Sequence, residues 1–199
     1  MFHLDEPIKA KLTEVRVLSQ KDRKPDEEPG AKLTLQMQLS NDALSMLDGA
    51  LKSTLFTRHA GGSDGAQKPL EDMEPVSDLP NLTPIGQQIG TIKWHHDFAG
   101  YELAMQYGTG RAGSNIGSEN CQLSNLRITP KEGGTIELKL DIVAPNVTEA
   151  MFGKLARLKS REVELALFAP DLSTRRDVED DDDAPAGNGG RKRQREAGK

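Results

Sequence analysis

Alternating apolar and polar residues dominate the pattern of the chain and predict β-strands. Apolar side chains occupy every second position over 33–39, 136–142 and 163–167. They do so again over 8–18, where the alternation slips once near Thr13. A period of two is typical of strands that bury one face, and a slip of one residue is typical of a β-bulge. The chain is therefore expected to build an antiparallel sheet.

Two segments change to helical spacing directly after residues that can cap a helix. The first, over 43–53, follows the run Ser-Asn-Asp at 40–42 and places its leucines on one side. The second, over 147–158, follows Asn146. Its apolar side is made by Val147, Met151, Leu155 and Leu158. Side-chain oxygens that cap backbone N–H groups, followed by an apolar stripe, predict two short amphipathic helices.

The segment 92–107 has the pattern of an aromatic β-hairpin. Apolar and aromatic residues alternate on both sides of Ala99-Gly100, which can form the turn. Among them are Trp94 and Tyr101, whose rings can stack on bases as aromatic rings do in proteins that bind single strands. Rings at such spacing also make cores and subunit interfaces. The hairpin is therefore a candidate for base stacking or for the contact of a homo-oligomer.

The order of the predicted elements repeats between the two halves of the chain. Residues 11–17 (KLTEVRV) match 122–128 (QLSNLRI), and residues 33–39 (LTLQMQL) match 136–142 (IELKLDI). A short helical segment follows in each half. Self-similarity of this kind indicates a duplicated supersecondary unit.

The repeat predicts an α+β fold. A strand–strand–helix–strand unit would occur twice, over 8–53 and 122–168, with Gly49 aligned to Gly153. The units would form an antiparallel sheet, or a pair of sheets, with the two helices packed on one side. We expect residues 1–171 to form a single domain.

Two segments lack the apolar periodicity of the rest. Residues 57–84 are rich in Gly, Ser, Pro and acidic residues, and a connection of that length is uncommon in a compact domain. Residues 172–199 contain an acidic run and then a basic run with few apolar side chains. Such composition cannot bury enough apolar surface to become ordered. We expect a flexible insert and a disordered charged tail.

Overall charge and cysteine content narrow the classes of function. A net charge of −5 argues against binding nucleic acid or an anionic membrane by overall charge alone. Cys121 is the single cysteine, so an intrachain disulfide and a zinc site built from cysteines are excluded. The first residues lack a signal-peptide pattern, and no apolar run is long enough to span a bilayer. The expected location is the cytoplasm, with no membrane partner.

No motif in the chain predicts catalysis. Residues 108–113 read GTGRAG, but they follow a predicted strand and open no helix, so an interstrand loop is favoured over a dinucleotide site. The alternative is a phosphate-binding turn beside Arg111. His95 and His96 are neighbours on a predicted strand and would point to opposite faces. The prediction is therefore no catalytic residue, no metal and no cofactor.

Basic residues provide the candidate contacts to nucleic acid. Lys154, Arg157 and Arg161 fall at i, i+3 and i+7 on the second predicted helix, and Lys159 lies nearby. This stripe can contact phosphates, although a solvated helix face has the same pattern.

The tail carries a second basic run that includes Arg191, Lys192 and Arg193. It follows the acidic block 180–183, which is a candidate for recruiting a protein partner.

The run GGTIELKLDIVAPNVTEAMFGKLARLKSREVELALFAP (133–170) resembles segments of small uncharacterised early-region proteins of tailed bacteriophages. It covers about a fifth of the chain and contains no functional motif. The resemblance implies a role in phage DNA metabolism or host takeover, in the cytosol of a bacterial host.

Taken together, these features predict a non-catalytic accessory protein of a phage or mobile element. It would bind single- or double-stranded DNA in replication, recombination or host takeover. The alternative is a homo-oligomeric structural or partner-inhibiting protein that associates through the 92–107 hairpin. A further alternative is a clamp-like processivity factor, because duplicated strand–helix units also build sliding clamps.

Overall fold

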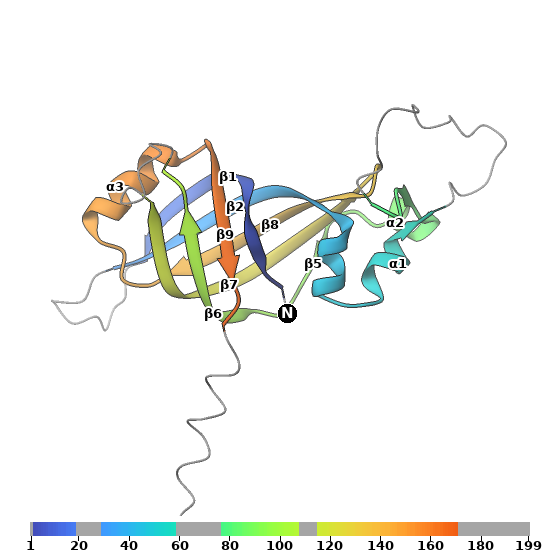
Figure 1. The fold of residues 1–199 in the computed structure, drawn as a ribbon, viewed down its shortest axis with the longest axis horizontal. Helices are drawn as coiled ribbons and strands as arrows, with labels where there is room; N and C mark the ends of the chain where they lie inside the picture. Colours follow the sequence, from blue (N-terminus) through green and yellow to red (C-terminus); the bar gives the residue numbers. More distant parts are fainter. Residues whose placement is uncertain (1, 19–28, 59–76, 108–114, 171–199) are drawn as a thin grey trace, which may run out of the picture.

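A sheet that closes on itself forms the body of the computed structural model, which describes residues 2–18, 29–58, 77–107 and 115–170. The strands of the closed sheet are β1 (Leu4–Leu18), β2 (Gly30–Ser40), β6 (Phe98–Met105), β7 (Ile116–Lys131), β8 (Thr135–Ala144) and β9 (Glu162–Phe168). Their order is β1-β2-β8-β7-β6-β9, and β9 pairs back to β1, with every pairing antiparallel (Figure 1). The predicted antiparallel sheet and the α+β class are confirmed at this level.

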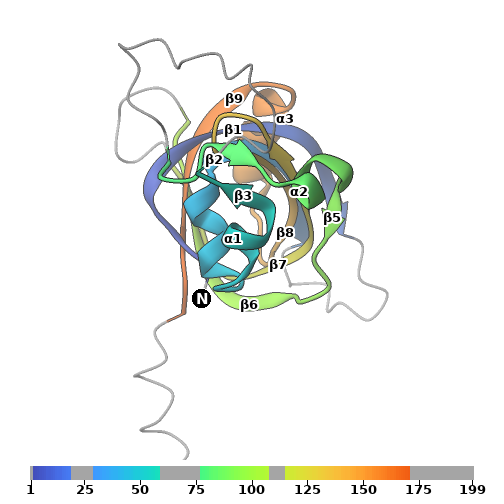
Figure 2. The same ribbon diagram turned by 90° about the vertical axis from the view of Figure 1, so that its right-hand side faces the viewer.

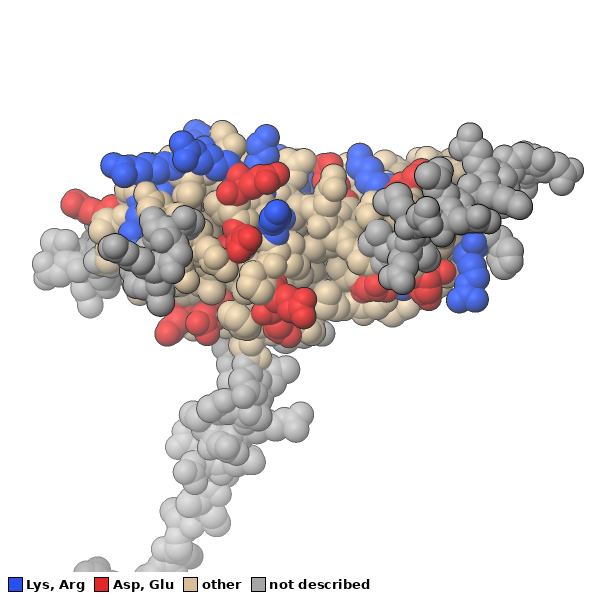
Figure 3. Space-filling model, turned by 45° about the horizontal axis from the view of Figure 1, so that its top comes forward, with Lys and Arg blue, Asp and Glu red and all other residues tan. Residues whose placement is uncertain are grey.

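The inside of the closed sheet is filled by aliphatic side chains. The alternation of period two sends one set of residues inward on each strand, and in β8 this set is Ile136, Leu138, Leu140 and Ile142, all buried. Leu12, Leu35 and Leu123 enter the same core from three other strands. The intervening positions carry most of the charged side chains, which lie on the outside (Figure 3). Burial of aliphatic surface therefore drives closure of the sheet.

Two β-bulges interrupt the pairing on either side of the β2–β8 pair. The register of β1 against β2 shifts between Leu12 and Glu14, which confirms the slip predicted near Thr13. The register of β7 against β8 shifts between Ser124 and Arg127, where Asn125 has a φ of 53°. Bulges bend strands and increase twist, as closure of a small sheet requires.

The helices lie at opposite ends of the closed sheet, which corrects the prediction that both would pack on one side. At one end is α3 (Glu149–Leu158). At the other are η1 (Asn41–Met46), α1 (Leu51–Leu55) and α2 (Pro84–Gln88), together with the small sheet of β3 (Phe56–Thr57) and β4 (Asn81–Leu82) (Figures 1 and 2). A closed sheet buries its own inner face, so the helices cover its ends instead.

The predicted hairpin over 92–107 is wrong. The segment contains β5 (Ile92–Lys93) and β6, and both pair with β7 instead of with each other. Ala99 and Gly100 belong to β6, where Gly100 has a φ of 80° beside a register shift. A glycine with positive φ serves a bulge as well as it serves a turn, so the local sequence did not distinguish the two.

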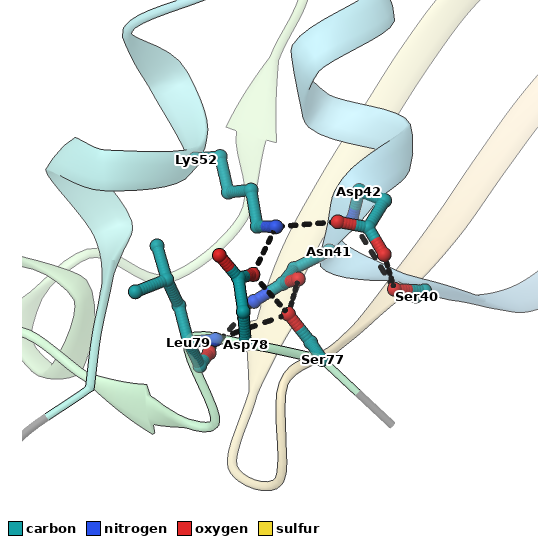
Figure 4. Close-up of polar contacts among 7 residues, drawn as sticks. All are labelled: Ser40, Asn41, Asp42, Lys52, Ser77, Asp78 and Leu79. Carbon is teal, nitrogen blue, oxygen red and sulfur yellow. Dashed lines mark hydrogen bonds and ion pairs between the residues drawn. The ribbon is translucent and has the colours of Figure 1, made fainter. Parts of the chain in front are cut away.

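Part of the segment 57–84, predicted to be a flexible insert, is ordered. Residues 59–76 and the predicted tail 172–199 lie outside the described residues, whereas 77–84 pack against η1 and α1. The side chain of Asn41 is fully buried, donates to the carbonyl oxygen of Leu79 (2.8 Å) and accepts from the Ser77 hydroxyl (Figure 4). The Asn41 N–H donates to the carbonyl oxygen of Gly134 (2.9 Å). These bonds join this segment to the β7–β8 turn.

The structure does not reproduce the residue alignment on which the duplication was predicted. Both halves contain a hairpin, β1–β2 and β7–β8, followed by helical residues. Leu12 pairs with Leu35, however, while its counterpart Leu123 pairs with Ile142. Gly49 lies in the turn between η1 and α1, whereas Gly153 lies within α3. The duplication therefore stays a prediction.

A buried carboxylate on the outer face links three neighbouring strands. Asp141 on β8 is 5% exposed and accepts hydrogen bonds from Thr34 Oγ1 on β2 (2.7 Å) and Asn125 Nδ2 on β7 (3.0 Å). Lys32 Nζ forms an ion pair with Asp141 Oδ2, the oxygen that Asn125 also contacts, at a distance of 2.9 Å. Burial alone would raise the pKa of Asp141, but the hydrogen bonds from Lys32, Thr34 and Asn125 outweigh it and hold the pKa below the ordinary 3.8.

We expect Asp141→Asn to lower the free energy of unfolding at pH 7 by roughly 1.5–3 kcal/mol, the range for a hydrogen bond to a charged group. A carboxyl with a lowered pKa stabilises the fold above its unfolded pKa and loses that contribution as the pH falls through the folded value. The deficit, measured by urea unfolding, should therefore shrink as the pH falls below 3.8. Glu119→Gln, at an exposed carboxylate, is the control. A deficit that is constant with pH would contradict this.

Two adjacent glycines in the β7–β8 turn provide a matched test of the contact between this turn and residues 77–80. Both have positive φ, but a Cβ on Gly133 would meet nothing within 4 Å, whereas one on Gly134 would lie 2.9 Å from Ser77 Cβ. Alanine strains the backbone at either position by about 1–2 kcal/mol, and overpacking adds about 1–3 kcal/mol at Gly134 alone. Gly134→Ala should therefore be the less stable variant in urea unfolding. Equal free energies of unfolding for the two variants would show that residues 77–80 do not pack closely against this turn.

Candidate nucleic-acid interface

The helix α3 is positioned by its N-cap and by its apolar side. Thr148, not Asn146 as predicted, is the N-cap, and its hydroxyl accepts a hydrogen bond from the Met151 N–H (3.2 Å). Asn146 instead has a φ of 52° in the turn that precedes the helix. Leu155 and Leu158 are buried against the end of the closed sheet. The opposite side of α3 therefore faces solvent.

The end of α3 is fixed to the sheet by backbone hydrogen bonds. The N–H of Ser160 donates to the carbonyl oxygen of Leu12 (2.6 Å), and the Leu12 N–H donates to the carbonyl oxygen of Arg161 (3.0 Å). Ser160 takes a positive φ of 66° in this turn. The basic residues that flank the turn consequently have defined positions beside β1.

The structure brings the predicted basic residues together on one surface. Lys154 and Arg157 lie on α3, Lys159 is its C-cap residue, and Arg161 follows in the turn. Arg157, Lys159 and Arg161 are exposed and Lys154 is half-buried. Lys and Arg side chains gather over this end of the molecule (Figure 3). We call these four residues, with Tyr107, the α3 basic surface.

Tyr107 is the member of this surface that the sequence placed in the aromatic segment 92–107 and not with the basic residues. Lys154 Nζ lies 5.7 Å from the centroid of its ring, within the range of a cation–π contact. A hollow of about 440 Å³ is lined by Tyr107, Arg157, Leu158 and Arg161. A second, of about 350 Å³, is lined by Tyr107, Ala150, Gly153, Lys154 and Arg157. Tyr107 and Arg157 thus line both hollows.

The other predicted aromatic contacts are not part of this surface. Tyr101 is fully buried and its hydroxyl donates to the carbonyl oxygen of Phe2, so its ring cannot stack on a base. Trp94 is half-buried beside β5, and its backbone N–H donates to Leu126 (2.8 Å). β5 lies on the side of α1, away from α3 (Figure 1). Tyr101 is therefore excluded as a base-stacking residue, because its ring is turned into the core, whereas Trp94 stays a predicted contact that lies apart from α3.

Three sequence predictions fall outside the described residues. They concern the basic run with Arg191, Lys192 and Arg193, the acidic block 180–183, and the glycine-rich run 108–113. Within the described ranges, no group of three or more His, Cys, Asp and Glu side chains is placed to hold a metal ion. None of the helices in those ranges is long and apolar enough to cross a membrane.

A polar cluster at the other end of the sheet contains a lysine, a serine and two aspartates, residue types that occur in catalytic sites, but its lysine cannot act as a base. Lys52 bridges the carboxylates of Asp42 and Asp78, and the Ser77 hydroxyl lies beside Asp78 (Figure 4). Asp42, and then Asp78, raise the pKa of Lys52 above 10.5. A lysine that stays protonated cannot accept the proton of Ser77. Lys52 is therefore not a base for Ser77, and the cluster ties residues 77–79 to η1 and α1.

Cys121 is also a poor nucleophile. Its side chain is buried in the core, and burial raises the pKa of the thiol above its ordinary 9.0. The thiolate, which is the reactive form, is thereby disfavoured.

Comparison of the chain with protein-family models, with curated proteins and with solved structures finds no match. The assignment of function consequently depends on the geometry described above.

Proposed function

We propose that this protein binds nucleic acid through the α3 basic surface and does not act on it chemically. The observation that carries the proposal is that Tyr107, half-buried against the core, lines two hollows together with Lys154, Arg157 and Arg161. Cations that contact phosphates, beside a ring that stacks on a base, are the two components of sequence-independent recognition of single strands. An accessory role in DNA replication or recombination, in the cytoplasm, fits such a surface.

The positive charge of the α3 basic surface favours a contact with nucleic acid that is confined to this surface. The whole chain has a net charge of −5, so a polyanion is repelled by most of the molecule and attracted only where cations are concentrated. The α3 basic surface contains four basic side chains, which lie on the ten residues of α3 and in the turn that follows it. Binding should consequently be weak in high salt, because it depends on release of counterions from a few phosphates.

The shape of the surface favours a single strand over a duplex. A hollow of about 350–440 Å³ beside a ring can receive an unpaired base, whereas the bases of a duplex are stacked inside it. Reading a duplex requires an element that enters a groove, and α3 lies against the end of the sheet with its apolar side covered. We therefore favour single-stranded DNA or RNA as the ligand.

The competing hypothesis was a homo-oligomer that associates through 92–107. Both edges of β6 are already paired, with β7 and β9. That segment thus offers no free β6 edge to a second copy, and an oligomer contact there would have to use side chains instead of strand pairing.

Neutralising the α3 basic surface should reduce the salt dependence of binding. We expect Lys154→Gln, Arg157→Gln and Arg161→Gln together to lower the slope of log K against log salt by about 2 for a single-stranded oligonucleotide, since each lost contact contributes about 0.7. The measurement is fluorescence anisotropy between 50 and 200 mM salt, roughly the range over which phosphate contacts are resolved. The charge-matched control replaces the exposed residues Arg58, Lys93 and Lys131 with Gln. Equal slopes for the two triple variants would contradict the proposal.

Variants of Tyr107 should distinguish the contribution of base stacking to binding from the contribution of charge. Tyr107→Leu should weaken binding to a single strand by about 1–3 kcal/mol, the usual contribution of one stacked base, and leave the salt slope unchanged. Tyr107→Phe keeps the ring and should bind like the original protein. Binding to duplex DNA of the same length should change little. If Leu and Phe behave alike, Tyr107 does not stack on a base.

A further inference from the structure

A second hollow with an excess of positive charge lies on the outer face of the closed sheet, across β1, β2, β8 and β7. It has a volume of about 230 Å³. Its lining consists of Glu14, Arg16, Lys32, Thr34, Asn125, Arg127, Lys139 and Asp141. The four cations outnumber the two carboxylates by two charges. None of these residues belongs to the α3 basic surface.

The strand register sets like charges opposite one another at this hollow. Arg16 on β1 pairs with Lys32 on β2, and Arg127 on β7 pairs with Lys139 on β8. Like charges directly opposite on a sheet are destabilising. A fold that keeps two such pairs at one hollow violates a local rule, and such violations are typical of functional sites.

Both β-bulges lie close in sequence to residues that line the hollow. The bulge between Leu12 and Glu14 precedes Arg16, and the bulge between Ser124 and Arg127 places Asn125 against Asp141. Arg16 Nε is 2.7 Å from Glu14 Oε1, and Arg127 Nε donates to Asn125 Oδ1 at 3.4 Å. A guanidinium has five N–H donors, so these bonds engage one donor in each and leave four for a ligand.

The floor of the hollow is already neutral. Asp141 is compensated by Lys32 (2.9 Å) and by the hydrogen bonds from Thr34 and Asn125. Glu14 offsets one more cation, Arg16. The remaining excess of two charges, carried by the guanidinium of Arg127 and the ammonium of Lys139, matches a dianion with several acceptor oxygens.

We propose that this hollow is a binding site for a phosphate group, either free inorganic phosphate or a small phosphomonoester. Arg127 and Lys139 contact the group from the β7–β8 side and Arg16 from the β1 side. Lys32 neutralises Asp141 beneath it. The ligand would relieve the like-charge pair of Arg127 and Lys139, which has no neutralising carboxylate in the hollow, so binding should stabilise the fold.

The test uses the full chain and two probes, inorganic phosphate and glycerol phosphate, at pH 7.5 and constant ionic strength. We expect a saturable rise in thermal midpoint and saturable ¹H–¹⁵N shifts at residues of the hollow with at least one probe. A response to both probes assigns recognition to the phosphate group itself, and a response to inorganic phosphate alone assigns it to the free ion. No saturable response to either probe would overturn the proposal.

Three variants identify the site. Arg127→Gln and Lys139→Gln should each weaken the apparent affinity about tenfold by removing charge-assisted hydrogen bonds. Glu14→Gln should tighten it several-fold, because it releases Arg16, and a merely structural role for the cluster predicts no gain. Lys131→Gln, exposed on the same strand and outside the hollow, is the control.

The α3 basic surface offers the competing anion site. Arg157→Gln with Arg161→Gln should leave phosphate binding unchanged while it weakens oligonucleotide binding. If this pair abolishes the phosphate response and the hollow variants do not, the outer-face site is wrong.

Discussion

Closure of the sheet is the constraint on which the other features of the molecule depend. Backbone hydrogen bonds run from β1 through β2, β8, β7, β6 and β9 and return to β1. Each strand of this ring has both edges satisfied, so the aliphatic core lies inside and the helices are left to cover the ends. The same closure places alternate residues of every strand on a continuous outer wall. The two anion-binding surfaces proposed above occupy that wall and one of its ends.

The strands and α3 were predictable from the sequence because their determinants are local. Period-two alternation identified β1, β2, β8 and β9 to within a few residues, and the slip near Thr13 identified a bulge. Closure was not predictable, since an alternating strand has the same pattern in an open and a closed sheet. The pairing of β5 and β6 with β7 was missed because Gly100 suits a turn and a bulge equally well.

In the candidate site, too, the sequence predicted the residues that are close to one another along the chain and missed the contacts between distant segments. The basic residues of α3 were found because helical spacing alone places them on one side. Tyr101 was misassigned because its burial depends on Phe2, ninety-nine positions away in the sequence. The contact of Tyr107 with α3 was missed because α3 is distant from it in the sequence, and the outer-face hollow was missed because its residues come from separate strands. Only the register of four strands brings Arg16, Lys32, Arg127 and Lys139 to one place.

The seam of the closed sheet joins β1 to β9, which are the first and the last of the described strands. β1 begins at Leu4 and β9 ends at Phe168, and Figure 1 shows the blue strand beside the orange one. The ring cannot close while the ribosome still holds β9, so the hydrophobic interior of the nascent chain stays open until synthesis of this domain is almost finished. Pairing of such distant segments is slow relative to local contacts. During translation, the edges of β1 and β6, which both pair with β9 in the finished fold, are therefore open to a chaperone or to another nascent chain.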